Sequence, residues 1–418
     1  PPESLHAPGV FGPWAHPDRT SAASRVIEDR LAMLLDHYLA QVDERRWYGF
    51  WDYGDVMHAY DGDRHCWRYD IGGYAWDNSE LSTDQWLWVS FLRTGDARTF
   101  RLAEAMTRHT GEVDVYHAGE FAGFGTRHNV QHWGCSCKQL RISNALYRRY
   151  LYFLTADERI GDLLDEVSMS DAMLVALDHN RSVGSREGAR EGNPRAVEVD
   201  LGIDYGAILA SWLTRWERYG DPVAAQRIAE TLTDVGRMPH RFFTGIGHLD
   251  LATGRFDVTE ERESISHLSA VFGIVETIDE ILKLVELPEF ERAWLEYCEL
   301  YLAPSPRQLE VLSAPWDGAL KQAHSRLLAW AAVRLGREDL AAQAWEVFFS
   351  PGAGDRMNIN SLDTDARLEV TSPAVAEPVT ELAGVNTNDA AQYSLAAVMN
   401  LALIGDQLPE APAVPLSR

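Results

Sequence analysis

Apolar and polar residues follow a helical period along most of the chain. From Ser21 to about Val42, apolar residues recur every three or four positions, which predicts an amphipathic helix. A paired pattern then repeats, in which an apolar helix ends at a short turn and a second helix leaves it. The turns lie around Gly95-Asp96, Asp157, Gly220-Asp221, Leu287-Pro288, Gly336 and Gly405-Asp406. Glycine suits the left-handed end of a helix, and Asp or Pro suits the start of the next one.

This repeat predicts an all-α fold. About six helical hairpins are expected, with turns separated irregularly by on the order of 50–70 residues. An (α/α)6 toroid, in which an outer ring of helices wraps an inner ring, accommodates such spacing. An open solenoid is the alternative, although its repeats are normally shorter and more regular. We expect the toroid over residues 21–410, a linker or N-terminal extension over 1–20, and a tail over 411–418.

Long connections between the hairpins should gather at one end of the ring. They cover residues 44–79, 112–137, 181–204, 240–266 and 351–388. Loops of this length inside a compact domain are usually functional or disordered. Two of them, GRFDVTEERESI and RLEVTSPAVAEPVTEL, are expected to contain short strands. The sequence therefore places function at the end where these loops meet.

Composition restricts the partners. The net charge of −25 disfavours a nucleic acid or a membrane surface. No apolar run is long enough to cross a bilayer, and four cysteines make no disulfide framework. No signal peptide is visible, so cytoplasmic and secreted locations both stay open, as does the oligomeric state. An acidic substrate would require basic groups to gather locally.

The stretch from Trp47 to Glu80 interleaves aromatic and acidic side chains with glycines. This pattern suits a sugar pocket, because aromatic rings stack on pyranose faces and carboxylates hold hydroxyl groups. The alternative is structural, with the aromatic side chains plugging the end of the ring. We expect the stretch to contribute to a pocket.

The stretch from Tyr116 to Tyr150 gathers most of the groups that could move protons or hold an anion. They are His117, Arg127, His128, Asn129, His132, Lys138 and Arg141. His128 and His132 are four residues apart and could ligate a metal on one helix face, but no standard zinc spacing accompanies them. General acid–base catalysis is a better explanation for these two histidines, because a histidine titrates near neutral pH. We expect no cofactor, and a structural divalent cation remains the alternative.

A helix is expected to begin directly after this loop. It would place Lys138 and Arg141 one turn apart, with Arg141 facing the mouth of the ring. Arg148 and Arg149 are expected on a solvated face. Five further residues are candidates for the pocket, ranked below those of the two stretches: His240, Arg241, His248, Arg262 and His267.

Three motifs together resemble a known family. They are WRYDIGGYAWDNSE at Trp67–Glu80, RLAEAMTRHTGEVDVYHAG at Arg101–Gly119 and RHNVQHWG at Arg127–Gly134. They resemble the exo-rhamnogalacturonan lyases, a family of polysaccharide lyases. The resemblance implies an α/α toroid catalytic domain, normally flanked by β-rich domains. It also implies β-elimination at a galacturonate, which releases an unsaturated product from a chain end.

The family motifs match five positions that suit this reaction. These are Tyr74, Arg127, His128, Asn129 and His132. Elimination requires a base for the C5 proton, a neutraliser for the charge that develops on the carboxylate, and an acid for the leaving oxygen. We expect Arg127 and Asn129 to neutralise, either histidine to be the base, and Tyr74 or the other histidine to be the acid. The expected substrate-binding residues are Trp67, Tyr53, Asp55, Trp76, Asp77, Glu80, His117, Trp133, Lys138 and Arg141.

Two other functions stay open on the same fold. A glycoside hydrolase of unsaturated uronide oligosaccharides would use paired acids such as Asp55, Asp70, Asp77 or Glu80. A non-catalytic carbohydrate-binding protein would need only the aromatic residues. Each function has an acidic oligosaccharide or polysaccharide as its partner. All three depend on one geometric expectation, that the two stretches meet at the same rim of the ring.

Overall fold

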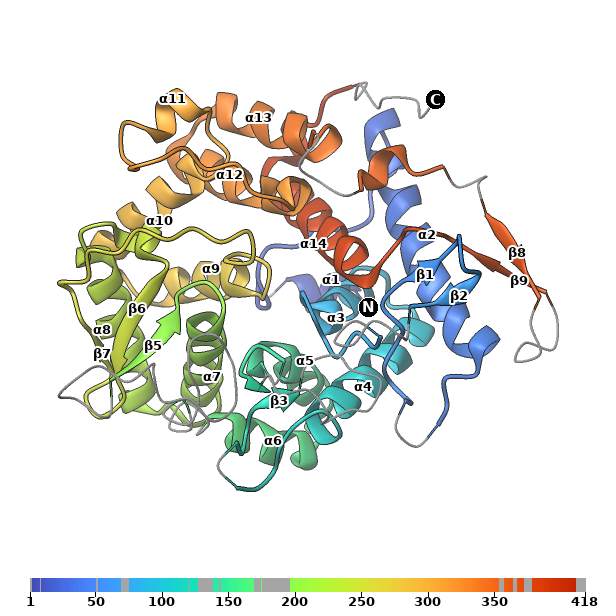
Figure 1. Ribbon diagram of the computed structural model, residues 1–418, viewed down its shortest axis with the longest axis horizontal. Coiled ribbons are helices and arrows are strands. Elements are labelled where there is room, and N and C mark those ends of the chain that lie inside the picture. Colours follow the sequence, from blue (N-terminus) through green and yellow to red (C-terminus); the bar gives the residue numbers. More distant parts are fainter. Residues whose placement is uncertain are drawn as a thin grey trace.

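The computed structural model describes most of the chain. The described residues are 2–7, 9–49, 52–68, 75–119, 121–126, 138–142, 144–168, 174, 196–352, 357–363, 367–371 and 378–410. Within them, helices form two concentric layers and the strands are short (Figure 1). The predicted all-α architecture is confirmed.

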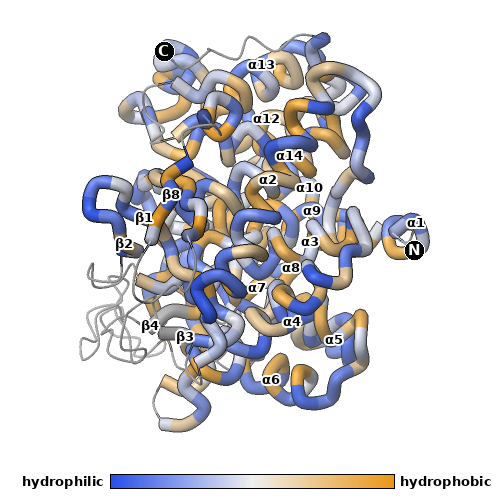
Figure 2. The backbone as a smooth tube through the Cα atoms, turned by 90° about the vertical axis from the view of Figure 1, so that its right-hand side faces the viewer, coloured by the Kyte–Doolittle hydropathy of each residue, from blue (hydrophilic) through white to orange (hydrophobic). Residues whose placement is uncertain are grey.

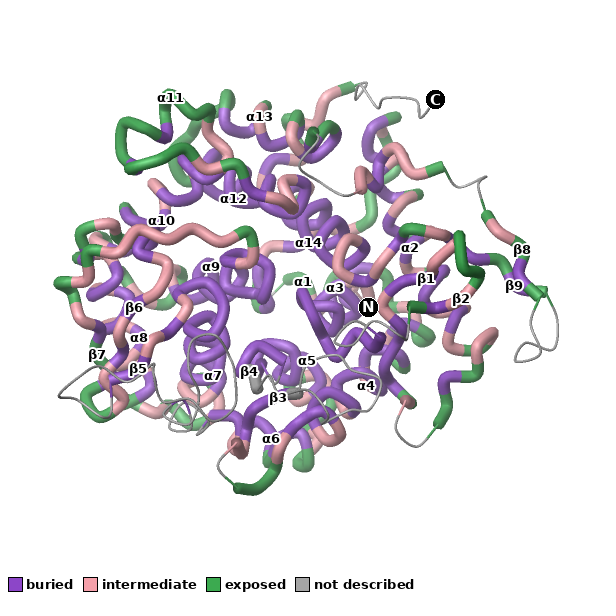
Figure 3. Tube along the Cα trace, viewed as in Figure 1, coloured by how far each residue is buried: buried purple, intermediate pink, exposed green. Residues whose placement is uncertain are grey.

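Twelve of the described helices alternate between an inner and an outer ring. The inner helices are α3 (Thr83–Thr94), α5 (Ala145–Thr155), α7 (Asp204–Tyr219), α9 (Ile274–Leu284), α12 (Lys321–Leu335) and α14 (Thr387–Ile404). The outer helices are α2 (Ala22–Arg45), α4 (Ala97–Glu112), α6 (Glu158–Ser168), α8 (Pro222–Arg237), α10 (Pro288–Leu300) and α13 (Glu338–Phe349). Inner helices are buried over most of their length, whereas the outer ones keep an exposed face (Figure 3).

The ring closes between its last and first inner helices. Helix α14 packs against α3. Just before α3, the carbonyl oxygen of Leu81 accepts a hydrogen bond of 2.5 Å from Nε2 of Gln392 in α14. Close by, the backbone N–H of Thr387 donates to the carbonyl oxygen of His58 at 3.0 Å. An open solenoid would leave these groups apart, so the closed toroid is confirmed.

Short turns join each inner helix to the next outer helix, as predicted. Gly95, Gly220 and Gly336 end their helices with φ of +68°, +62° and +64°. Ala156 takes the same left-handed conformation without being glycine. The prediction is wrong at Gly405, whose φ is −63°. There the chain continues into the 3-10 turn η4 (Gly405–Gln407) and no outer helix follows among the described residues, so no left-handed stop is needed.

The strands lie in the long connections. They are β1 (Tyr60–Asp61), β2 (Cys66–Trp67), β3 (Gly125–Thr126), β4 (Lys138–Gln139), β5 (Ala196–Asp200), β6 (Ile246–Asp250), β7 (Arg255–Phe256), β8 (Leu368–Val370) and β9 (Val379–Glu381). All pairs are antiparallel, in the groups β1-β2, β3-β4, β5-β6-β7 and β8-β9. The strands predicted in GRFDVTEERESI and RLEVTSPAVAEPVTEL are therefore present as β7, β8 and β9. Figure 2 shows β1, β2, β3, β4 and β8 on one side of the molecule and the short helix α1 (Pro2–His6) on the opposite side.

Part of the expected N-terminal extension packs against the ring. Phe11 and Trp14 are buried, and Phe11 stacks on Tyr150 of α5 with the ring centroids 4.4 Å apart. The remaining described elements are short: α11 (Ser305–Gln308), η2 (Arg241–Thr244) and η3 (Ile359–Ser361). None of the described helices combines the length and the apolar character needed to cross a membrane.

The expected solvated face of α5 is wrong. Arg148 and Arg149 are both buried, because α5 belongs to the inner ring and is enclosed at these positions on all sides. Arg149 donates to Glu280 of α9 at 2.6 Å and to Glu217 of α7 at 2.8 Å. Arg148 donates to the carbonyl oxygen of Thr110 in α4 at 3.0 Å. Both arginines therefore tie helices together inside the toroid.

Candidate functional site

A cavity of about 470 Å³ opens at the long-loop end of the ring. Four segments enclose it: the first long loop, the segment before α9, the segment before α12 and the start of α14. Its lining residues are His58, Ala59, Tyr60, Arg68, Glu80, Leu81, His267, Leu268, Ala319, Leu320, Gly384, Asn386, Asn388 and Asp389. A volume of this size suits a small ligand or a short piece of an oligosaccharide.

Three inner helices begin at this cavity. Leu81 precedes α3, Leu320 precedes α12 and Asn388 lies in the first turn of α14, and all three line the cavity. The N-cap residues of α3 and α12, Ser82 and Leu320, are left-handed and make no capping hydrogen bond with their side chains. The N-terminal end of a helix carries a partial positive charge and exposed N–H groups, which favour an anion.

The backbone leading into α3 is strained. Four non-glycine residues have left-handed φ: Asn78 at +48°, Ser79 at +62°, Leu81 at +53° and Ser82 at +70°. Such conformations are costly for residues with a Cβ atom and persist only where the surroundings fix them. Here Gln392 holds Leu81, and the hydroxyl of Ser82 donates to the carbonyl oxygen of Val271 at 3.0 Å. The fixed backbone presents Glu80 to the cavity.

Glu80 is joined to Arg141, another predicted substrate-binding residue. The guanidinium donates to the Glu80 carboxylate at 3.0 Å, and both side chains are buried. The guanidinium also lies over the ring of Phe272, 4.3 Å from its centroid. Arg141 does not lie on a helix as expected, because α5 begins only at Ala145. Of this pair, Glu80 lines the cavity and Arg141 lies behind it.

Asp55 belongs to a buried charged cluster and not to the cavity wall. The side chains of Asp55, His109 and Asp114 are almost completely buried. His109 Nε2 lies 3.2 Å from Asp114 Oδ2 and 3.8 Å from Asp55 Oδ2. The amide Nδ2 of Asn78 donates to Asp114 at 2.6 Å and to Asp55 at 3.2 Å. The cluster thus ties the first long loop to the end of α4.

Asp55, His109 and Asp114 are also the described residues that could hold a metal ion, with ligand atoms within 4.8 Å of one another. The Nδ1–H of His109 donates to the carbonyl oxygen of Tyr53 at 3.0 Å, so Nε2 is the nitrogen that faces the carboxylates. Burial opposes a charge on this ring, but Asp114 and Asp55 outweigh it and raise the pKa of His109 to about 9. A proton on Nε2 therefore supplies the positive charge between the carboxylates at neutral pH.

Asp77 is likewise interior. Its side chain is fully buried, and burial, reinforced by the charge of Asp55, raises its pKa well above the usual range. Thr83 and Thr387 lie beside it at the starts of α3 and α14. The expectation that Asp55 and Asp77 bind substrate is therefore wrong for this structure, because both carboxyl groups point into the protein interior.

The aromatic residues of the first loop form a plug. Trp67 and Trp76 pack edge-on against Trp47, with ring centroids 5.2 and 5.8 Å away. They are only 6% and 9% exposed. The expected stacking of these two rings on a sugar is wrong, since their faces are covered by other side chains. The structural alternative describes them correctly.

Two further predicted residues lie outside the cavity. Tyr53 is 52% exposed and lines a separate groove between α2 and α4. His117 lies on the outer surface, where its Nδ1 is 2.9 Å from a carboxylate oxygen of Glu166 in α6. Neither residue lines the cavity at the long-loop end, so their contact with substrate stays a prediction.

Seven predicted residues lie outside the described part of the chain: Asp70, Tyr74, Arg127, His128, Asn129, His132 and Trp133. The side chain of Lys138 is not described either. The strands that flank these segments do lie together: β3 and β4 are on the same side of the molecule as β1 and β2 (Figure 2). The described parts of the two stretches thus share one end of the ring.

Sequence reasoning missed the contribution of the last inner helix. Asn386, Asn388 and Asp389 line the cavity, and the Asn386 side chain caps α14 by accepting from the N–H of Asp389 at 2.8 Å. His58 reaches the same helix, with its Nδ1 2.9 Å from the hydroxyl of Thr387. The signal was present as Asn-Thr-Asn-Asp before an apolar run, a helix-start pattern. Nothing local indicated that this start lies beside the first loop.

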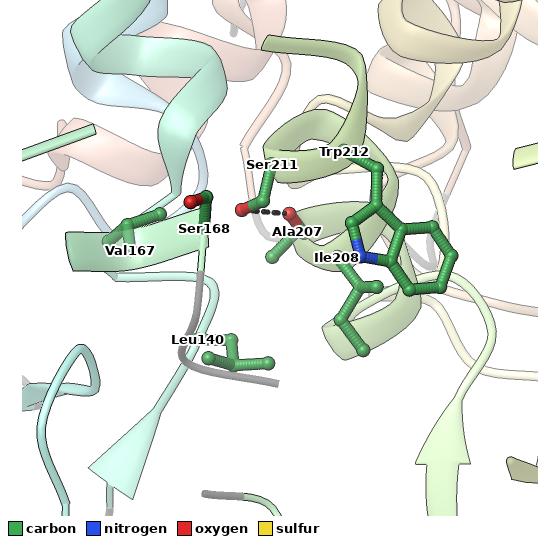
Figure 4. Close-up of a pocket in the computed structure, with 7 residues that line it drawn as sticks. All are labelled: Leu140, Val167, Ser168, Ala207, Ile208, Ser211 and Trp212. Atoms are coloured by element: carbon green, nitrogen blue, oxygen red, sulfur yellow. Dashed lines mark hydrogen bonds between the residues drawn. The ribbon is translucent and has the colours of Figure 1, made fainter. Parts of the chain in front are cut away.

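A smaller space lies between α6 and α7 (Figure 4). It holds about 10 Å³ and is lined mainly by Leu140, Val167, Ile208 and Trp212. The hydroxyl of Ser211 turns away to the carbonyl oxygen of Ala207 at 3.0 Å. Such a volume has room for one water molecule at most, so this space belongs to the packed interior.

The family of the chain follows from comparison with known proteins. The model of the PcRGLX-like protein C-terminal α/α toroid domain matches residues 1–409. The chain belongs to this family. It is also 35% identical over 418 residues to the uncharacterized protein YetA of Bacillus subtilis (strain 168). That match covers 98% of this chain and 47% of the length of YetA.

Solved structures with a related fold are unsaturated glucuronyl hydrolases. The enzyme from Bacillus sp. GL1, responsible for the degradation of glycosaminoglycan, has a TM-score of 0.48 at 10% identity, over 90% of this chain and 98% of that one. A heparin-specific unsaturated glucuronyl hydrolase has a TM-score of 0.45 at 15% identity, over 91% of this chain and 99% of that one. Likeness at this level says nothing about the reaction of this chain.

Proposed function

We propose that the chain is the catalytic toroid of a polysaccharide lyase, which cleaves a uronate-containing, rhamnogalacturonan-like glycan by β-elimination from a chain end. One observation carries this proposal: the uncapped starts of the inner helices α3 and α12 lie at a cavity that also contains His58, Arg68 and His267. The helix starts and the guanidinium of Arg68 supply positive charge in the cavity, where the carboxylate of Glu80 is paired with Arg141 and that of Asp389 also lines the wall. A uronate carboxylate would be attracted there. The motif resemblance to the exo-rhamnogalacturonan lyases supports the same reaction class, and the family of the toroid domain supports the fold on which it would occur.

The reaction divides into proton removal and departure of the leaving group. A base takes the C5 proton, the electron pair of that C–H bond forms the C4–C5 double bond, and the C4–O bond breaks. The leaving oxygen takes a proton from an acid. In the proposal His128 or His132 is the base, and Tyr74 or the other histidine is the acid. Arg127, Asn129 and the helix starts stabilise the negative charge that develops on the carboxylate.

The test is to follow ultraviolet absorbance and reducing ends together on rhamnogalacturonan and homogalacturonan. A lyase produces both signals, and at least one of His128→Ala and His132→Ala should lower the rate by about 100-fold or more. His6→Ala is the matched control, because His6 lies on α1 at the opposite side of the molecule (Figure 2). Unchanged rates in both loop variants would contradict the proposed roles.

A hydrolase on the same fold is the second candidate, and one observation favours it: two carboxylate residues, Glu80 and Asp389, line the same cavity. Reducing ends without ultraviolet absorbance would identify hydrolysis. Glu80→Gln and Asp389→Asn should then abolish turnover, whereas His128→Ala should not. Binding of the polysaccharide with neither product would indicate a non-catalytic carbohydrate-binding protein.

A further inference from the structure

A second groove lies on the outside of the ring, between α2 and α4. It has a volume of about 660 Å³. Its lining residues come from α2, α4 and the first long loop, and α2 and α4 lie on the right-hand side of the ring in Figure 1. It is formed by outer helices, whereas the cavity at the long-loop end is formed by the starts of inner ones. The two spaces share no lining residue.

Two exposed tyrosines stand together in this groove. Tyr48 and Tyr53 are each 52% exposed, and their ring centroids are 5.9 Å apart at an angle of 36°. Large aromatic side chains contribute most to stability when they are buried, so two neighbouring exposed rings suggest a ligand surface. A pair of rings at this spacing offers apolar faces to successive sugar units.

Contacts to α4 hold the backbone of Tyr53, and a contact to α2 holds the hydroxyl of Tyr48. Gly54 has φ of +98°, and a Cβ atom there would lie 2.2 Å from the carbonyl oxygen of Ala105, so the backbone beside Tyr53 rests directly on α4. The buried His109 binds the carbonyl oxygen of Tyr53 at 3.0 Å. The hydroxyl of Tyr48 donates to Asp43 of α2. Binding to rings fixed in this way loses little conformational entropy.

The polar rim of the groove supplies both donors and acceptors. The guanidinium of Arg98 lies 2.8 Å from a carboxylate oxygen of Asp96 and 3.4 Å from one of Asp36. Arg98 lines the groove together with Arg101. Asp36 and Asp43 line it as well. Sugar hydroxyl groups donate and accept hydrogen bonds, so a mixed rim around two aromatic rings matches a carbohydrate better than an anion or an apolar peptide.

We infer that this outer groove is a second carbohydrate site, which holds a pyranose chain against Tyr48 and Tyr53. The site retains polysaccharide on the surface while a chain end occupies the cavity. The inference rests on the proposed function only for the choice of polysaccharide, since binding in the groove requires no turnover.

The test is affinity electrophoresis of the full chain in gels that contain rhamnogalacturonan. The double variant Tyr48→Ala/Tyr53→Ala should bind the polysaccharide about tenfold more weakly, because two stacking contacts are lost. Tyr53→Trp, which keeps an aromatic face, should retain binding. Tyr219→Ala is the matched control, because Tyr219 is 55% exposed on α7 and its hydroxyl also donates to an aspartate, Asp165.

Activity separates this inference from the proposed function. The double variant should show a higher KM on the polymer and an unchanged kcat on short oligosaccharides. Loss of polymer binding in the double variant supports the groove even when the wild-type protein yields no unsaturated product. Wild-type binding in a double variant with an unchanged melting temperature overturns the inference. A change of oligomeric state with unchanged polysaccharide binding also overturns it, and assigns the groove to protein–protein contact.

Discussion

Helix starts at the two ends of the toroid differ in how their free N–H groups are satisfied. At the short-turn end, helix ends are completed by their own neighbours: Asp96 accepts from the N–H of Arg98 at 2.8 Å, and Asp221 accepts from that of Val223 at 2.9 Å. At the long-loop end, Ser82 and Leu320 start α3 and α12 without capping side chains, and Gln392, far away in sequence, holds the backbone before α3. The starts of α4 and α8 are therefore satisfied by their own side chains, whereas that of α3 depends on a long-range contact beside a cavity.

This difference indicates where a binding site can form. A side-chain cap satisfies one or two of the four free N–H groups at a helix start, whereas an uncapped start beside a cavity can offer all four to a ligand. Holding such an end requires partners from elsewhere, such as Gln392 for Leu81. Substitutions at the long-loop end should therefore cost more than equivalent ones at the short-turn end.

The largest contrast is expected for charged pairs. Glu276→Ala leaves Arg326 buried without the carboxylate that it meets at 3.0 Å, and the free energy of unfolding should fall by about 3–5 kcal/mol. Asp339→Ala removes the partner of Arg337, a pair that is 43% and 64% exposed, and should cost less than about 1 kcal/mol. Urea denaturation of both variants measures the difference. Equal losses of unfolding free energy in the two variants would contradict the difference between the two ends of the toroid.

Glycines with positive φ provide the second contrast. At Gly245, whose φ is +67°, a Cβ atom would lie 2.0 Å from the carbonyl oxygen of Ser264. Gly245→Ala should cost about 2–4 kcal/mol, because backbone strain adds to a clash that no side-chain movement relieves. Gly220 has a similar φ of +62° with nothing within 4 Å of the added atom. Gly220→Ala should therefore cost only about 1 kcal/mol. Thermal and urea unfolding of the two variants should preserve this order.

The pH dependence of stability is expected to show a smaller effect. Burial raises the pKa of Asp84 to about 7, although the hydroxyl of Thr110 donates to it at 2.9 Å. Between about pH 4 and 7 the folded state keeps this proton and the unfolded state loses it, so stability falls as the pH rises. Asp84→Asn should flatten that fall in melting temperature. Asp339→Asn, at an exposed position, should leave it unchanged.

The titration of His109 extends the same fall in stability to higher pH. Its pKa is raised to about 9, against about 6.5 in an unfolded chain, so its contribution is complete below pH 6.5 and lost as the pH passes 9. His109→Gln should remove this part of the pH dependence. A profile that stays level from pH 6.5 to 9 in the wild-type protein would contradict a proton between Asp55 and Asp114.

The smallest effect is expected from metal removal. Because His109 carries a proton between Asp55 and Asp114, and burial raises the pKa of Asp55 to about 7, little uncompensated charge is left for a metal ion, and a chelator should shift the melting temperature by less than about 1 °C. Addition of zinc provides the opposite test. A rise in melting temperature in the wild-type protein, absent from His109→Gln, would show that a metal displaces the proton.

Predictions from the sequence succeeded where the signal was local. The helical period and the Gly-Asp turns indicated the hairpins, and Gly95, Gly220 and Gly336 take the expected conformation. For Trp67 and Trp76, the same residue types suit a sugar platform and a buried plug, and only packing distinguishes them. Arg148 and Arg149 were misplaced because a charged pair on a helix normally faces solvent. An inner helix has no such face.

The sequence by itself determined the helical hairpins, their short turns and the family, because each depends on residues close together in the chain. Tertiary structure decided which carboxyl groups face a ligand. Asp55 and Asp77 point inward, while Glu80, three residues beyond Asp77, lines the cavity because a left-handed backbone turns it there. That turn is held by Gln392, 311 positions away from Leu81. Contacts over such a separation exist only after the ring has closed, so no local pattern encodes them.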